Sequence, residues 1–294
     1  MVAEPFPLPT HLRTSGSRDD DGFVAWLAEL PARVRDVARR WELRLEAPYE
    51  PGGSASWVAP ARDRAGRDAV LKVAWNHDEA RDEAEGLAAF GGEGAVEVFA
   101  FEHDGPATVL LLERCRPGTP LRDRPEAEQH VVVAELLVRL WDVPLPVRHP
   151  FRPLSAMTDG WATNAAARHA ARHGLLDPGL VRDGLALFRS LPRDAGRSAL
   201  LCTDLHAGNV LAGTRRPWLL VDPKPYVGDP HYDVLQHLLN CPAALRRDPV
   251  GLLRHVADLA GLDAERVRRW LFARCVQESP LAPDLADVAR RTAP

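Results

Sequence analysis

The chain has almost no lysine. Of its 37 basic residues only Lys72 and Lys224 are lysine, and all the others are arginine. Such a bias is typical of a GC-rich genome, in which arginine replaces lysine wherever charge alone matters. The two remaining lysines are therefore candidates for positions that need a compact ammonium and do not suit a planar guanidinium.

Other features are missing as well. The four cysteines are far apart and form no Cys-x-x-Cys pair, which favours a reducing, cytoplasmic setting. No run of eighteen apolar residues suggests a membrane span, and the first residues lack the basic start and apolar stretch of a signal peptide. With a net charge of −4 and scattered basic residues, the chain shows no basic stripe for a nucleic acid. We expect a cytoplasmic protein without nucleic-acid or membrane partners, as a monomer or weak homodimer.

The 294 residues suffice for one large domain or two lobes. Residues 1–22 are rich in Pro, Ser, Asp and Gly and are predicted to be a flexible lead-in. Residues 23–115 are predicted to form a strand-rich lobe, with helices over 23–41 and 77–90 and strands near 43–47, 57–58, 69–74, 96–101 and 108–112. Residues 116–294 are predicted to form a helical lobe, with helices over 126–141, 161–173, 178–191, 230–240, 248–260 and 263–277. The fold class is α+β.

Residues 202–233 contain the side chains best suited to phosphoryl transfer. Asp204 stands five residues before Asn209, and Asp222 follows Asp204 by eighteen residues at the end of an apolar run. Phosphoryl transfer needs a base beside the attacking hydroxyl and oxygen ligands for Mg²⁺ beside the nucleotide phosphates. Segments 209–212 and 218–222 are predicted to pair as a hairpin that brings the three groups to one rim. Asp204 is the candidate base, and Asn209 and Asp222 are the candidate metal ligands.

A nucleotide site is predicted from the N-terminal lobe. A glycine-rich turn that includes Gly53 and Ser54 precedes Lys72 by about twenty residues, and its backbone N–H groups could approach phosphates. Lys72 lies in an apolar, strand-like run and would hold the α- and β-phosphates as a point charge. Among the acids of the following helix we choose Glu83 as its partner over Glu79 and Glu85. No Gly-Lys-Ser/Thr sequence is present, so the turn is not a Walker loop.

The catalytic segment resembles that of the aminoglycoside phosphotransferase family, which are small-molecule kinases with a fold similar to protein kinases. The family pattern His-Gly-Asp-Leu-His-x-x-Asn, a strand-end Asp and Gly-Asp-Pro-x-x-Asp is matched here by Asp204-Leu-His206-Ala-Gly-Asn209, Asp222 and Gly228-Asp229-Pro230-His-Tyr-Asp233. Asp222-Pro-Lys224 and residues 110–121 look most like the branch of streptomycin 6-kinases and hydroxyurea phosphotransferases. Cys202-Thr203 stands where most members have His-Gly, which puts the support of the loop in doubt more than the chemistry.

The resemblance covers roughly residues 45–240 and implies a bilobal protein-kinase-like fold. Its N-terminal lobe would be a small antiparallel sheet with one main helix, and its C-terminal lobe would be larger and mostly helical. The linker at Glu113 and Cys115 would meet the adenine through its backbone. Acceptor recognition would lie in the helical lobe, where the candidates are Asp159, Trp161, Asp233 and Glu278; Asp229 and Asp233 also resemble the family's structural acids.

The predicted function is an ATP- and Mg²⁺-dependent O-phosphotransferase of a small hydroxylated molecule, an aminoglycoside-type antibiotic or hydroxyurea, with GTP as an alternative donor. Two alternatives stay open: a kinase of a biosynthetic metabolite, and a nucleotide-binding module without turnover. A protein kinase is disfavoured because no Asp-Phe-Gly or activation segment is present. Zinc at Cys202, His206 and His231 is disfavoured because their spacing is not that of a zinc site.

Overall fold

The computed structural model describes residues 6–15, 20–78, 81–172 and 174–294. The chain divides into two compact units. Unit 1 contains the residues up to Gly118 together with Gly213–Arg215, and unit 2 contains Thr119–Ala212 and Arg216–Pro294. The predicted lobe boundary at 115/116 lies three residues before this division.

Unit 1 is built on an antiparallel sheet. Within the described residues the sheet has five strands in the order β1-β2-β3-β5-β4. Their bounds are β1 (Arg44–Leu45), β2 (Ser56–Arg62), β3 (Asp68–Trp75), β4 (Val98–Asp104) and β5 (Ala107–Glu113). The predicted strands are all found, and four of them are longer than predicted.

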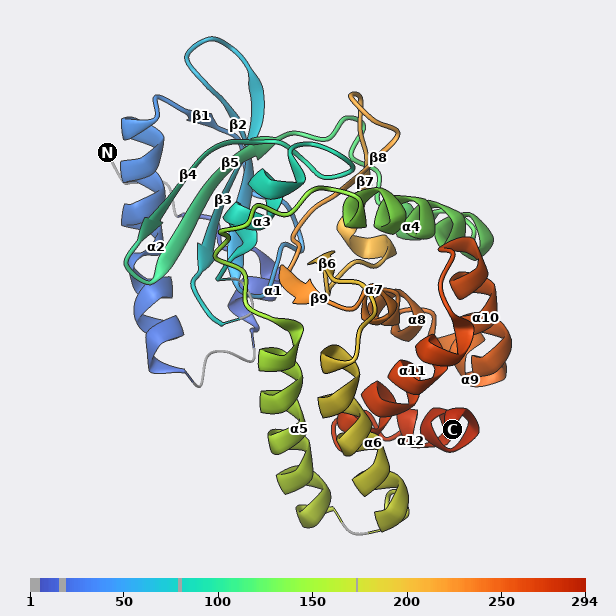
Figure 1. Cartoon of the computed structure of the whole chain (residues 1–294). Coiled ribbons are helices and arrows are strands. Elements are labelled where there is room, and N and C mark those ends of the chain that lie inside the picture. The colour runs from blue at the N-terminus through green and yellow to red at the C-terminus, as the bar shows by residue number, and fades with distance from the viewer. Residues whose placement is uncertain (1–5, 16–19, 79–80, 173) are drawn as a thin grey trace. The chain divides into compact units, whose positions relative to one another are not determined.

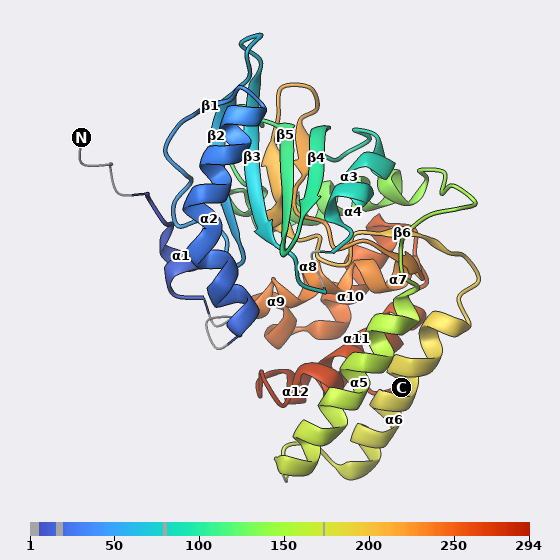
Figure 2. The ribbon, with the colours of Figure 1, turned by 90° about the vertical axis from the view of Figure 1, so that its left-hand side faces the viewer.

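The two helices that flank this sheet lie on opposite faces (Figures 1 and 2). Side chains alternate between the faces of a strand, so Leu71 and Val73 point to one face and Lys72 to the other. The first face packs against α2 (Asp21–Arg40) in a core whose fully buried members include Phe23, Trp26 and Leu30. The second face carries Lys72 and α3 (Glu83–Phe90). The strand period therefore places the lysine away from the main hydrophobic core.

The segment before α2 packs against the sheet. Phe6 stacks on Trp57 with ring centroids 5.5 Å apart, and Leu12 of α1 (Thr10–Arg13) is fully buried. His11 donates its backbone N–H to the carbonyl of Pro51 at 2.9 Å. The prediction of a flexible lead-in over residues 1–22 is therefore corrected for residues 6–15, whose apolar side chains find partners on β2. Residues 1–5 and 16–19 lie outside the described part of the chain.

Unit 2 is mostly helical. Its longer helices are α4 (Glu126–Trp141), α5 (Leu154–Ala171), α6 (Pro178–Ser190), α10 (Pro249–Leu259), α11 (Ala264–Glu278) and α12 (Leu285–Thr292). The shorter ones are η2 (Leu121–Asp123), η3 (Leu191–Arg193), η4 (Ala207–Asn209), α7 (Pro230–Asp233), α8 (Leu235–Leu239) and α9 (Pro242–Arg247). Figure 1 shows α5 and α6 side by side as a helical hairpin.

Two small antiparallel ladders lie in unit 2 and flank the segment that contains Asp204, Asn209 and Asp222. One pairs β6 (Ala199–Leu201) with β9 (Tyr226–Gly228), and the other pairs β7 (Val210–Ala212) with β8 (Trp218–Leu220). The second ladder is the predicted hairpin. Its strands are short, so their main effect is to fix where the loops at their ends begin.

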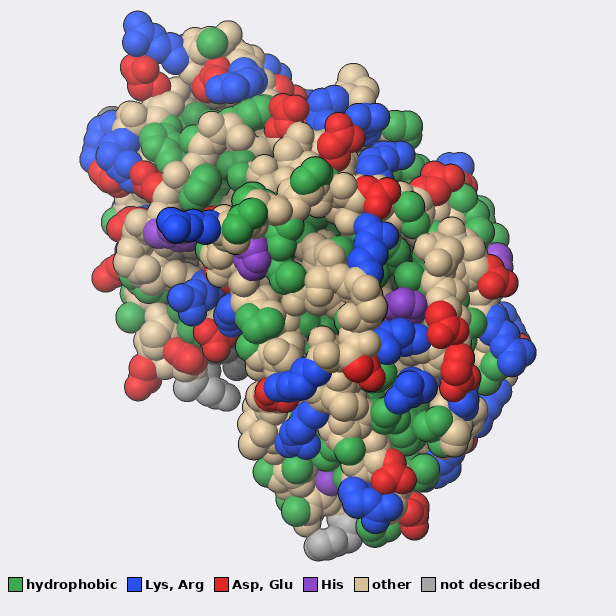
Figure 3. Space-filling model, in the orientation of Figure 1, with side chains coloured by type: hydrophobic (Ala, Val, Ile, Leu, Met, Phe, Trp, Pro, Cys, Tyr) green, Lys and Arg blue, Asp and Glu red, His purple; other side chains and the backbone are tan. Residues whose placement is uncertain are grey.

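Some predicted bounds are wrong. The helix predicted over 77–90 begins only at Glu83, because Asp82 has non-helical backbone angles. The helix predicted over 230–240 is interrupted at Val234 and forms α7 and α8. No described helix has the length and apolar character needed to cross a membrane. On the face drawn in Figure 3, basic and acidic side chains are interspersed.

Candidate functional site

The loop after β6 carries the candidate base. Asp204 donates its backbone N–H to the carbonyl of Cys202 at 2.7 Å. The Nδ2 of Asn209 donates to the Asp204 carbonyl at 3.0 Å and approaches the Asp204 carboxylate at 3.4 Å. Asn209 ends η4, one turn after Asp204. The five-residue spacing thus closes a tight loop in which the carboxylate and the carboxamide are neighbours.

The second carboxylate lies at the same end of the hairpin. Val210 pairs with Leu220, and Val221 donates its N–H to the Asn209 carbonyl at 2.8 Å. Asp222 follows directly with a φ of +56°, a left-handed conformation that is uncommon for a residue with a side chain. Backbone strain of this kind clusters at functional sites. The hairpin therefore brings Asn209 and Asp222 to one rim, as predicted.

Lys224, the second lysine of the chain, contacts this rim. Its Nζ lies 2.6 Å from Oδ1 of Asp222, and both side chains are partly exposed. The lysine backbone N–H donates to the Cys202 carbonyl at 2.8 Å. The backbone of the loop that contains Asp204 thus helps to hold an ammonium against one of the two candidate metal ligands.

The Cys202-Thr203 pair is supported by the buried Asp233. Its carboxylate, fully buried, accepts N–H bonds from Cys202 at 2.9 Å, Thr203 at 2.6 Å and the Trp141 indole at 2.9 Å. Burial raises the pKa of Asp233 to about 6 although these donors oppose the rise, so the group is ionised at neutral pH. The prediction that Asp233 contacts the acceptor is corrected, because its oxygens are enclosed and bind the loop.

Thr203 also helps to hold this loop in place. It has a φ of +46°, which explains why glycine is common at this place in the family pattern. Its hydroxyl donates to the Lys224 carbonyl at 2.5 Å. The left-handed backbone costs about 1–2 kcal/mol, and this hydrogen bond offsets part of that cost by tying two loops together.

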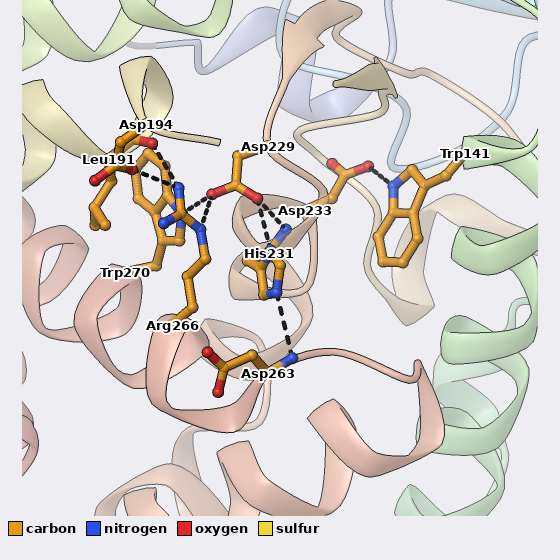
Figure 4. A network of polar contacts seen from close by, with 9 residues as sticks. All are labelled: Trp141, Leu191, Asp194, Asp229, His231, Asp233, Asp263, Arg266 and Trp270. Carbon is orange, nitrogen blue, oxygen red and sulfur yellow. Dashed lines mark hydrogen bonds and ion pairs between the residues drawn. The ribbon is translucent and has the colours of Figure 1, made fainter. Parts of the chain in front are cut away.

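Asp229 is the centre of a second buried network (Figure 4). Its carboxylate, which is 2% exposed, accepts from His231 Nδ1, Arg266 Nε and Trp270 Nε1, each at 2.7 Å. Burial raises the pKa of Asp229, but hydrogen bonds from His231 and Trp270 more than offset this and leave it below its usual range. This residue is structural, as its resemblance to the family's acids indicated.

We expect Asp229→Asn to lower the free energy of unfolding by about 1–3 kcal/mol, because a buried amide nitrogen then faces the N–H donors of His231, Arg266 and Trp270 and leaves at least one of them unsatisfied. Urea denaturation measures this loss. The matched control is Asp263→Asn, an exposed helix cap of α11 whose loss costs no more than about 1 kcal/mol. Equal stability of the two variants would contradict the structural role of Asp229.

The zinc set considered from the sequence does not form a cluster. Cys202 is fully buried at the end of β6, and His231 is bound to Asp229. His206 accepts the N–H of Gly208 at 3.1 Å, and burial lowers the pKa of its imidazole. His206 therefore folds back on its own loop.

In unit 1, Lys72 and Glu83 form a buried ion pair. The lysine Nζ lies 2.6 and 2.7 Å from the two carboxylate oxygens, with Lys72 6% and Glu83 1% exposed. Glu85 instead contacts His103 at 2.9 Å, and Glu79 lies outside the described residues. The choice of Glu83 as the partner is confirmed. The pair holds the ammonium at a fixed point on the face of the sheet away from α2.

The glycine-rich turn leads into β2, and residues that precede it in the chain hold it in place. Gly52 has a φ of +73°, and a Cβ there would come within 2.5 Å of Pro9, so only glycine fits. His11 Nδ1 lies 3.0 Å from the Gly52 carbonyl. Gly53 is partly exposed and Ser54 is exposed. Pro9 and His11 therefore fix the turn. The sequence analysis did not predict this support.

The start of the linker after β5 is bound by a residue that the sequence analysis did not consider. Arg215, at the tip of the β7–β8 hairpin, lies in unit 1 and donates to Glu113 at 2.7 Å and to the Gly92 and Ala95 carbonyls. Cys115 is partly exposed, and burial raises the pKa of its thiol to about 12. The Glu113 side chain is thus paired with Arg215. The predicted contact of the linker with adenine involves the backbone and does not need this side chain.

The remaining acceptor candidates are already paired. Asp159 binds Arg193 at 2.6 Å beside an open groove of about 630 Å³ on α6. Trp161 lies under the Arg274 guanidinium at 4.8 Å, and Glu278 binds the same guanidinium at 2.6 Å. The structure brings Trp161 and Glu278 together around Arg274, which sequence reasoning did not identify.

Comparisons with known proteins agree with this site. Residues 40–282 match the family model described as aminoglycoside/hydroxyurea antibiotic resistance kinase. A hydroxyurea phosphotransferase of Kitasatospora aureofaciens is 38% identical over 84% of this chain and 72% of its own length. A streptomycin 6-kinase of Streptomyces glaucescens is 33% identical over 87% of this chain and 83% of its own.

A solved structure shows the same fold. The choline kinase of Streptococcus pneumoniae matches with a TM-score of 0.60 and 10% identity, over 90% of this chain and 97% of its own. The predicted α+β, protein-kinase-like fold is therefore confirmed. Since the family model covers most of the chain and two relatives exceed 30% identity over most of their length, the chain belongs to the aminoglycoside/hydroxyurea antibiotic resistance kinase family.

Proposed function

We propose that this protein transfers the γ-phosphoryl group of ATP to a hydroxyl of a small molecule. The observation that carries the proposal is the rim on which Asp204, Asn209 and Asp222 are held by one loop and one hairpin. Family membership supports the same reaction, because the relatives named above are kinases of hydroxyl-bearing molecules.

The residues have separate roles. Asp204 accepts the proton of the acceptor hydroxyl and orients its oxygen. The carboxamide and carboxylate oxygens of Asn209 and Asp222 are hard ligands of the kind that suits Mg²⁺, and this ion would neutralise charge on the phosphates. Lys72, fixed by Glu83, binds the phosphates, and the turn at Gly53 and Ser54 approaches them through backbone N–H groups. The linker at Glu113 and Cys115 contacts the adenine of the nucleotide through its backbone.

The pairing of the acceptor candidates favours a neutral acceptor. A polycationic aminoglycoside needs several carboxylates with charge to spare. Asp159 and Glu278 are each neutralised by an arginine, and Asp233 is buried. We therefore propose an acceptor of the hydroxyurea type over a streptomycin type, with Trp161 and Glu278 near it. A metabolite alcohol is the alternative that shares this neutral chemistry.

The test is an ADP-release screen with ATP and Mg²⁺ against hydroxyurea, streptomycin, other aminoglycosides and neutral alcohols. The proposal predicts acceptor-dependent ADP release that is strongest with a neutral acceptor. Stronger turnover of streptomycin would overturn the charge argument. ATP binding without acceptor-dependent release across the panel would overturn the transferase itself and favour a binding module.

Lys224 gives a further expectation for this reaction. Its ammonium shares Asp222 with the proposed metal, so Lys224→Met should lower the Mg²⁺ concentration needed for half-maximal rate, because a competing cation is removed. The maximal rate should fall about 100-fold, which is the usual effect of removing one hydrogen-bond donor to the charge that develops in a transition state. Steady-state kinetics at varied Mg²⁺ measures both. An unchanged maximal rate would show that Lys224 only balances the charge of Asp222.

A further inference from the structure

A cluster of two histidines and a cysteine lies inside unit 2, apart from the residues assigned to the reaction. Nδ1 of His130, on α4, lies 2.8 Å from Nε2 of His237, on α8. Sγ of Cys241, two residues after the end of α8, lies 4.0 Å from the same Nε2. The three side chains are 5%, 0% and 3% exposed. Within the described part of the chain, this is the group whose ligand atoms all lie within 4.8 Å of one another.

The spacing suits one shared cation. A tetrahedral zinc ion has Zn–N and Zn–S bonds of about 2.0–2.1 and 2.3 Å, which separate two nitrogens by about 3.4 Å and a nitrogen from a sulfur by about 3.6 Å. The observed N–N distance of 2.8 Å is shorter and the observed N–S distance of 4.0 Å is longer than these values. Side-chain rotations that move the ligand atoms by a few tenths of an ångström would therefore admit the ion. Two facing imidazole nitrogens this close cannot both carry a proton, so a lone pair already points into the cluster.

The local sequence explains why the ligands meet. His237 and Cys241 are four residues apart, and the turn that ends α8, in which the Cys241 N–H donates to the Leu238 carbonyl at 3.1 Å, brings their side chains together. On α4, Glu126 and His130 have the same spacing, and the Glu126 carboxylate lies 3.8 Å from Nε2 of His130. A carboxylate facing the second nitrogen of a ligating histidine orients the ring and strengthens its donation to a metal. Glu126 would thus be the outer partner of a ligating histidine, and the imidazoles and the Cys241 thiol would be the ligands, an arrangement found around bound metals.

We propose that His130, His237 and Cys241 form a site for one borderline or soft cation of the Zn²⁺ class. The two imidazoles bind as neutral ligands through Nδ1 and Nε2, and the Cys241 thiol binds as thiolate after its proton leaves to solvent. Nitrogen and sulfur donors exclude Mg²⁺ and Ca²⁺, which require oxygen ligands. The site joins α4 to α8 within the unit that carries the catalytic loop, and it is independent of the proposed function.

Titration of the chelator-treated full chain with Co²⁺ tests the site. We expect one Co²⁺ per chain, visible d–d bands of a tetrahedral ion, a near-ultraviolet thiolate-to-cobalt band, and displacement of all of these by Zn²⁺. Cys241→Ser should remove the thiolate band and weaken binding by more than about 100-fold. The matched control is Cys275→Ser, since Cys275 is another buried cysteine of unit 2, and it should keep the band.

A second measurement does not depend on how the variants fold. X-ray absorption of the wild-type Zn²⁺ complex should show one sulfur and at least two imidazole nitrogens around the metal. No bound Co²⁺, a zinc shell of oxygens only, or a thiolate band that persists in folded Cys241→Ser would each overturn the proposal.

Discussion

Asp204→Asn is expected to lower kcat by about 10²–10⁴-fold, the usual contribution of a general base. The amide keeps the shape of the side chain but cannot take the proton of the acceptor hydroxyl. Because Asp204 is not assigned to the nucleotide, the affinity for Mg·ATP should stay within about threefold of wild type. Acceptor-dependent ADP release gives kcat, and calorimetric titration gives the affinity.

The control for this variant is Asp263→Asn, an exposed acid of unit 2 that caps α11. It should keep wild-type kcat, which separates loss of the base from a general effect of removing a charge. Turnover of Asp204→Asn at the wild-type rate would remove Asp204 from the reaction and would direct attention to the other groups of the rim.

Lys72→Met is expected to affect both stability and nucleotide binding. It breaks an ion pair whose other member, Glu83, is 1% exposed, and breaking a buried pair costs about 3–5 kcal/mol. It also removes the charged donor to the phosphates, which should weaken Mg·ATP by about 10- to 100-fold, from the worth of a charge-assisted hydrogen bond. Urea denaturation and calorimetry measure the two effects separately.

The double variant Lys72→Met, Glu83→Leu separates the two roles of the pair. Replacing a buried ion pair with apolar residues is often neutral or stabilising, so the free energy of unfolding should return to the wild-type value or above it. Nucleotide affinity should stay low, since the ammonium is still absent. Recovery of Mg·ATP binding together with stability would show that Lys72 has only a structural role.

The hairpin and the ion pair were predictable because their determinants are local. The alternation of β3 alone sends Lys72 to the face opposite Leu71 and Val73, and a short turn fixes the pairing of Val210 with Leu220. The distance from Lys72 to Glu83 in sequence is eleven residues, so few chain arrangements compete. Patterns of this length carry most of the information that a single sequence offers.

The parts that could not be predicted depend on partners far away in the chain. Residues 6–15 belong to a segment rich in Pro, Ser, Asp and Gly that looks like a flexible lead-in, and only Trp57 and the turn at Pro51 show what they pack on. The missing loop histidine looked like a loss of support, yet Asp233 binds two loop N–H groups and the Thr203 hydroxyl binds Lys224. Arg215 looks like a turn residue, but its partner Glu113 is 102 residues away.

The acceptor site is the least predictable part, for a physical reason. Whether Asp159 or Glu278 can bind a cation depends on whether an arginine neutralises it, and Arg193 and Arg274 are 34 and 4 residues away in sequence. The spacing of four residues on one helix favours the Arg274–Glu278 pair, but nothing near Asp159 in the sequence indicates its pairing with Arg193. Charge available to a substrate is a property of the folded chain.

The central claim is that Asn209 and Asp222, which the β7–β8 hairpin brings together, hold one and the same Mg²⁺ beside the nucleotide phosphates. A double-mutant cycle of Asn209→Ala and Asp222→Asn on Mg·ATP affinity, measured by calorimetry, tests it most directly. Groups that share a ligand through its metal and phosphates should show a coupling energy of about 0.5–3 kcal/mol, whereas unconnected groups give additive losses. Strictly additive losses, or wild-type affinity in either single variant, would contradict the claim.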